Sequence, residues 1–203
     1  MPSDLKAIAS TFGPDWWRPP LFYSHRFALR FELAQGDFWI DRLESAKHRA
    51  RTIMEAALGG SDDVRIVIAR FHDGPTLCGE DRDCFDNALT AYGLPPVPAY
   101  EAQSVPASGD DDGSTWLGAT EFPRHQIDRV TWAAVASDVG YLPTTPGWVF
   151  VVSLSNALII HPYDDRGMDV VAASPKTLRP LYDGFGDWLL DHDRPRMDDA
   201  FKS

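Results

Sequence analysis

The chain has 203 residues, 44% of them hydrophobic, so it is long enough to enclose one core in a single domain over residues 1–203. It carries 30 acidic and 19 basic residues, and a surface with a net charge of −11 repels phosphates and anionic lipids, so we expect neither nucleic acid nor membrane as a partner. Two cysteines are too few for a disulfide framework, and no apolar segment suggests a signal peptide or a bilayer span, which favours a cytoplasmic protein.

The first elements predicted are a short helix and a strand. Residues 1–20 are expected to form an N-terminal extension that packs onto the domain through its two tryptophans, with a helix that ends at Gly13. Apolar residues then alternate with Ala28, Arg30 and Glu32, which predicts a half-buried strand over residues 27–33.

A long amphipathic helix follows over residues 37–58. Its apolar positions recur at steps of three and four, and the stripe includes Trp39 and Ile40. Asp37 is the expected N-cap. Residues 65–71 are predicted to be a strand buried on both faces. Strand, helix and strand in this order form a candidate β–α–β unit, whose crossover would be right-handed if the two strands were parallel.

The centre of the chain gives weaker patterns. They favour a short helix over residues 83–92, a strand over residues 116–122 and a helix over residues 124–138, where a strand is the alternative. Residues 95–113 contain four prolines and are predicted to be a long exposed loop. This loop also carries three consecutive acidic residues, Asp110, Asp111 and Asp112.

The last third predicts three strands and a helix. The strands are expected over residues 149–154, 157–163 and 168–172, and the helix over residues 175–190. Ser174 precedes Pro175 in the pattern of an N-cap followed by proline in the first turn.

The last two strands are joined by the tetrapeptide Asp164-Asp165-Arg166-Gly167. Asp at the first position and Gly at the fourth are typical of a type I β-turn, and the Asp side chain can accept a hydrogen bond from a backbone N–H two residues on. So short a connection predicts an antiparallel pair. Pro162 cannot donate to a ladder, so its strand should lie at a sheet edge or end near this residue.

Four segments of this chain resemble a bacterial family known only as domain of unknown function 3885. They are Tyr163–Gly167 (Tyr-Asp-Asp-Arg-Gly), Leu178–Tyr182 (Leu-Arg-Pro-Leu-Tyr), Asp187–Arg194 and Leu21–Leu33. Together with the helix after the last of these they cover about half the chain. The resemblance implies no activity, cofactor or site residue.

These patterns together predict a single α+β domain. A mostly antiparallel sheet should form its centre, with the helices over residues 37–58 and 175–190 packed on one face, because each has a single apolar stripe.

The sequence lacks the recognisable phosphate-binding, dinucleotide-binding, nucleophile-elbow and zinc-helix motifs, so we expect no cofactor and no metal. The candidate binding residues are the polar cluster around the last turn and the acidic triplet: His161, Tyr163, Asp164, Asp165, Arg166, Asp110, Asp111 and Asp112. Turn chemistry alone can account for Asp164 and Gly167, whereas an acid–base or anion-binding role is the functional alternative.

Two functions are compatible with this sequence. The first is a non-enzymatic protein-binding module whose partner is a basic protein, in particular an immunity protein that neutralises a basic bacterial toxin, because negative charge steers association with positive surfaces. The second is a small hydrolase-like enzyme with a polar site at the His161–Asp169 hairpin. The enzyme requires the polar residues of the hairpin to converge in a pocket.

Overall fold

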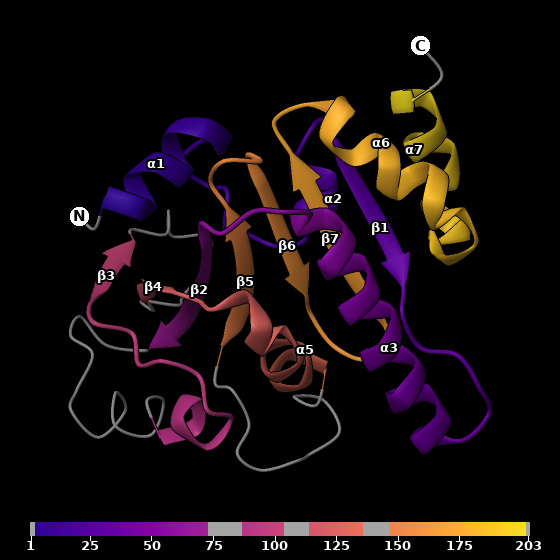
Figure 1. The fold of residues 1–203 in the computed structure, drawn as a ribbon. Coiled ribbons are helices and arrows are strands. Elements are labelled where there is room, and N and C mark those ends of the chain that lie inside the picture. Colours follow the sequence, from indigo (N-terminus) through magenta and orange to yellow (C-terminus); the bar gives the residue numbers. More distant parts are fainter. Residues whose placement is uncertain (1–2, 73–86, 104–113, 136–146, 202–203) are drawn as a thin grey trace.

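The predicted α+β domain is confirmed by a computed structural model, which describes residues 3–72, 87–103, 114–135 and 147–201 (Figure 1). Seven strands form one open antiparallel sheet in the order β1-β7-β6-β5-β2-β4-β3. The strands are β1 (Ala28–Glu32), β2 (Val64–His72), β3 (Tyr100–Gln103), β4 (Ser114–Glu121), β5 (Trp148–Ser153), β6 (Leu158–Pro162) and β7 (Gly167–Ala172).

The predicted β–α–β unit is present, but its two strands are not neighbours. Helix α3 (Trp39–Leu58) joins β1 to β2, and β7, β6 and β5 lie between these strands. Four antiparallel steps separate β1 from β2, so the two strands run parallel, and Figure 1 shows the connection as a right-handed crossover in front of the sheet. The C-terminal strands therefore fill the gap that this crossover leaves.

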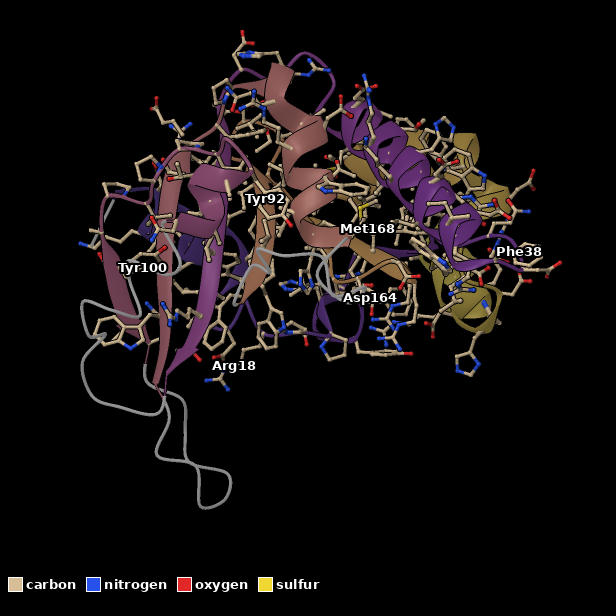
Figure 2. The ribbon with its side chains drawn as sticks, turned by 90° about the horizontal axis from the view of Figure 1, so that it is seen from below. Arg18, Phe38, Tyr92, Tyr100, Asp164 and Met168 are labelled. Atoms are coloured by element: carbon tan, nitrogen blue, oxygen red, sulfur yellow. The ribbon has the colours of Figure 1, made fainter. Side chains whose placement is uncertain are left out.

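The two helices predicted over residues 37–58 and 175–190 lie on one face of the sheet, as expected, and other helices cover the second face. Helices α3, α5 (Ile127–Val135) and α6 (Pro175–Gly184) lie on one face, whereas α1 (Ser3–Phe12) and α2 (Leu21–Ser24) lie on the other (Figure 1, Figure 2). The chain ends with α7 (Arg194–Phe201) beside α6. The described residues also form short 3-10 segments at Arg124–Gln126, Gly186–Trp188 and Asp191–Asp193.

The N-terminal segment is part of the core. Trp16 and Trp17 are buried, and the ring of Trp16 lies edge-on to Phe150 of β5 at 5.7 Å. Asp4 of α1 accepts a hydrogen bond of 2.8 Å from Arg65 of β2. The predicted packing of this segment onto the domain is thereby confirmed. Because the segment covers the second face of the sheet, the central strands are buried on both faces and are apolar on both.

The central predictions are confirmed in part. The strand expected over residues 116–122 is β4 (Ser114–Glu121). Of the helix expected over residues 124–138, the described part is a 3-10 turn at Arg124–Gln126 followed by α5 (Ile127–Val135). The loop predicted over residues 95–113 is wrong for Tyr100–Gln103, which form β3 and pair with β4. Before β3 the chain is irregular, but it is not fully exposed, because Val97 is only 1% exposed. Asp110, Asp111 and Asp112 lie outside the described residues, as do both cysteines.

Two helix ends differ from the predictions. Helix α3 begins at Trp39, and Phe38 rather than Asp37 occupies the N-cap, without a side-chain hydrogen bond. Helix α6 ends at Gly184 instead of residue 190. Its predicted start is confirmed, because the Ser174 hydroxyl accepts a hydrogen bond of 3.3 Å from the backbone N–H of Lys176. None of the helices in the described part of the chain is long and apolar enough to cross a membrane.

Candidate functional site

The turn between β6 and β7 is held by the buried carboxylate of Asp164. Its Oδ1 accepts hydrogen bonds from the backbone N–H groups of Arg166 at 2.7 Å and of Gly167 at 3.2 Å. The Arg166 guanidinium also donates to Oδ2, with its Nε at 2.8 Å. Asp164 therefore fixes the turn, as its position in the sequence predicts.

Gly167 is required by space rather than by backbone conformation. Gly167 is not among the residues with positive φ. A Cβ atom built on it would overlap the Tyr163 hydroxyl and lie 3.0 Å from the carbonyl oxygen of Phe31. The ring of Tyr163 thus lies directly over Gly167, and any side chain there would displace it.

Asp165 connects the turn to α3. Its carboxylate lies 3.6 Å from the guanidinium of Arg42 and is mostly buried. Asp164, Asp165 and Arg166 are consequently all engaged at the turn itself, in contacts that secure the hairpin.

His161 is buried in an aromatic environment on the face that α1 and α2 cover. Its ring stacks on Phe150 with centroids 4.5 Å apart and lies 5.9 Å from the ring of Tyr163. Neither ring nitrogen has a hydrogen-bond partner among the described residues. Burial, together with the charge of Arg30, lowers the pKa of His161 to about 3, so the imidazole is neutral at pH 7.

Beside His161 lies a buried ion pair that the sequence pattern did not reveal. Arg30 and Asp169 are cross-strand partners in β1 and β7, joined by two hydrogen bonds, Nε to Oδ1 at 2.7 Å and a terminal nitrogen to Oδ2 at 3.0 Å. The other terminal nitrogen donates to Asp193 at 3.4 Å. Asp169 also accepts from the backbone N–H of Phe22 at 3.0 Å, which ties α2 to the sheet.

Aromatic rings surround the Arg30 guanidinium, whose central carbon lies 5.0 Å from the ring of Phe22 and 4.8 Å from that of Tyr23. Burial alone would lower the pKa of Arg30, but the hydrogen bond and charge of Asp169 outweigh it and raise that pKa. Burial, followed by the charge of Asp169, raises the pKa of the Tyr163 hydroxyl well above its usual value. Arg30 is therefore charged and Tyr163 protonated at neutral pH.

A cavity of about 330 Å³ opens above this ion pair. It is lined by Pro19, Pro20, Arg30, Tyr163 and Asp169. Of the predicted binding residues that the structure describes, Tyr163 is the one that lines this cavity. The polar residues of the hairpin therefore lie in three places: the core, the cavity and the turn. An acid–base site needs these side chains to meet in one pocket.

A second feature that the sequence analysis missed is an exposed apolar patch at the start of α3, here called the Phe38–Ile40 patch. Phe38 is 70% exposed, Trp39 59% and Ile40 44%, although Trp39 and Ile40 were predicted to belong to the buried stripe. The signal was present: three consecutive bulky residues cannot all lie on one helix face, because successive positions are ~100° apart. Figure 2 shows Phe38 at the outer edge of the molecule.

Exposed acidic residues lie next to this patch in the sequence. Asp37, Asp41 and Glu44 are all exposed, and the first buried residue of α3 is Leu43. The first turn of α3 thus extends past the core and presents aromatic rings close in sequence to exposed acidic side chains.

The chain belongs to the family described as domain of unknown function (DUF3885), whose model matches residues 5–193. It is also similar to the uncharacterized protein YnaE of Bacillus subtilis (strain 168), with 41% identity over 44 residues, which is 22% of this chain and 21% of that protein. No solved structure matches. The expected family is confirmed, and the two descriptions state no activity.

Proposed function

We propose that this chain is a non-enzymatic protein-binding module and that it binds a basic protein through the Phe38–Ile40 patch. The observation that carries the proposal is the exposure of three adjacent large apolar side chains in a chain with a net charge of −11. Contiguous apolar exposure of this kind, bordered by polar residues, is typical of protein interaction sites.

The patch has the composition of an interface centre. Aromatic residues, tryptophan above all, are enriched among the few side chains that carry most of the binding free energy. Trp39 and Phe38 lie at the start of a 20-residue helix whose following turns are anchored in the core, so the backbone that presents them is held in place. A rigidly presented anchor loses less conformational entropy on binding than a flexible one.

The charge next to the patch supports a basic partner. Asp37, Asp41 and Glu44 favour a surface on which lysine and arginine side chains border an apolar pocket. A bacterial toxin of basic charge has this character, and occlusion of its basic cleft by an acidic immunity protein is the specific form of function that we propose. Negative charge would speed the encounter and the aromatic residues would slow dissociation.

The enzyme alternative has weaker support. It requires the hairpin residues to meet in one pocket, whereas Asp164 and Arg166 bond to each other and Asp165 pairs with Arg42. The nearest carboxylate to the cavity, Asp169, already accepts three hydrogen bonds. Neither arrangement leaves an unengaged carboxylate of the hairpin beside the cavity.

The test is binding to a candidate partner, the basic toxin encoded by a gene adjacent to the one for this chain. We expect Trp39→Ala to weaken the complex by tenfold or more, as at interface hot spots. The matched control is Asp62→Asn, an exposed acidic residue beyond the opposite end of α3. Tight binding that Trp39→Ala leaves unchanged, or absence of any basic protein that binds at low salt, would refute the proposal.

A further inference from the structure

The cavity above the Arg30–Asp169 pair has the properties of a small-molecule site. Its volume of about 330 Å³ falls in the range of ligand pockets, which begins near ~300 Å³. Two prolines supply rigid apolar walls, and Tyr163 lines the cavity beside them. Such a combination of apolar walls with a few polar groups is what orients a bound ligand.

The polar groups at the cavity retain hydrogen-bonding capacity. A guanidinium has five N–H groups, and those of Arg30 make three hydrogen bonds with Asp169 and Asp193. Each terminal nitrogen therefore keeps one N–H without a partner among the described residues. The Tyr163 hydroxyl likewise makes no hydrogen bond within the described part of the chain, and it can donate as well as accept.

The charges select against ionic ligands. Arg30 is already compensated by two carboxylates, so an anion would have to compete with Asp169 and Asp193 for the guanidinium. A cation would meet the fixed positive charge of Arg30, whose own counter-ions are fully engaged. A neutral group that accepts a hydrogen bond avoids both costs.

We infer that this cavity binds a neutral planar amide, either a primary carboxamide or a peptide group. The amide oxygen accepts from Arg30 or from the Tyr163 hydroxyl, and the flat face of the group packs against Pro19 and Pro20. This site is separate from the Phe38–Ile40 patch and does not depend on the function proposed for it.

Three probes of the same shape and different charge test the inference: benzamide, benzoate and benzamidine. Ligand-observed NMR titrations of the full chain at pH 7 should show saturable binding of benzamide, with a dissociation constant in the millimolar range for so small a ligand. Benzoate and benzamidine should each bind at least about fivefold more weakly, because each places a charge beside an ion pair that is already complete.

Two matched variants identify the site. Tyr163→Phe should weaken benzamide about three- to tenfold by removing one hydrogen bond. Tyr182→Phe, whose hydroxyl donates to Asp198 at 2.6 Å and does not line the cavity, should leave benzamide binding unchanged. Failure of benzamide to saturate, equal effects of the two variants, or tighter binding of either charged probe would overturn the inference.

Discussion

At the scale of single residues, burial decides the state of His161. Enclosed by Phe150, Trp148 and Tyr163, its imidazole has no polar partner among the described residues, so the neutral form is strongly preferred. A buried neutral histidine makes stability depend on pH, because the unfolded chain can take up the proton that the folded chain refuses.

The stability of the protein should accordingly fall in acid more steeply than that of His161→Leu. The pKa of His161 is 6.5 in the unfolded chain and about 3 in the folded one. As the pH falls below 6.5, the unfolded chain binds a proton that the folded chain does not, and the free energy of unfolding decreases. Relative to the variant, the wild type should lose up to ~1.4 kcal/mol per pH unit between these values. Urea denaturation from pH 7 to pH 4 measures the difference. Parallel curves for the two proteins would contradict a buried neutral imidazole.

Substitution of Gly167 should destabilise the protein, because Tyr163 packs closely against this residue. We expect Gly167→Ala to lower the free energy of unfolding by ~1–3 kcal/mol, because the new methyl group overlaps the tyrosine side chain. Gly184→Ala is the control: it lies at the end of α6 with open space around it, and should be neutral or slightly stabilising. Thermal or urea denaturation of both variants distinguishes a specific contact from a general intolerance of glycine substitution.

The two adjacent aspartates of the turn should differ in their contribution to stability. Asp164→Ala leaves two backbone N–H groups without their acceptor and should cost ~1–3 kcal/mol. Asp165→Ala removes one partly exposed ion pair with Arg42 and should cost less than ~1 kcal/mol. Equal losses in urea denaturation would show that the ion pair matters as much as the turn.

At the scale of secondary-structure elements, the carboxylate of Asp169 connects β7, β1 and α2. Asp169 on β7 binds Arg30 on β1 and the backbone of α2. These contacts hold α2 against the second face of the sheet. The side chain of Arg30 is 11% exposed, so its charge depends on its partners for solvation. The ion pair therefore acts as a polar connection within an otherwise apolar layer.

Breaking this pair on one side should be more harmful than removing it. We expect Asp169→Ala to destabilise the fold by ~3–5 kcal/mol, because it leaves Arg30 buried with only the longer contact to Asp193. The double variant Asp169→Leu with Arg30→Met should be more stable than the single one, since no buried charge remains. Urea denaturation of the wild type and both variants tests this, and a double variant no more stable than Asp169→Ala would contradict the expectation.

At the scale of the whole molecule, periodicity predicted most elements of the fold and little of the site. The strands over residues 149–172 and the helix α3 follow directly from apolar patterns, as does the turn at Asp164. Periodicity describes one element at a time, however, so it could not show that α2 covers the second face. Arg30 was therefore assigned to solvent, although strand pairing places it beside Asp169.

The candidate binding surface escaped the sequence analysis for a similar reason. An apolar stripe predicts which side of a helix is buried but not where along its length the core ends. In α3 the core ends at Leu43, and the preceding turn with Trp39 and Ile40 is left exposed. Only the three-dimensional arrangement distinguishes an overhanging first turn from a buried one.

The most direct test of the binding proposal is the salt dependence of association with the adjacent-gene toxin. Surface plasmon resonance between about 50 and 500 mM salt should show an association rate that falls as salt rises, since steering is screened beyond a Debye length of ~10 Å at 0.1 M. Asp37→Asn with Asp41→Asn should slow association, whereas Trp39→Ala should mainly speed dissociation. Rates that do not respond to salt, or dissociation that Trp39→Ala leaves unchanged, would contradict binding through an aromatic patch flanked in sequence by acidic residues.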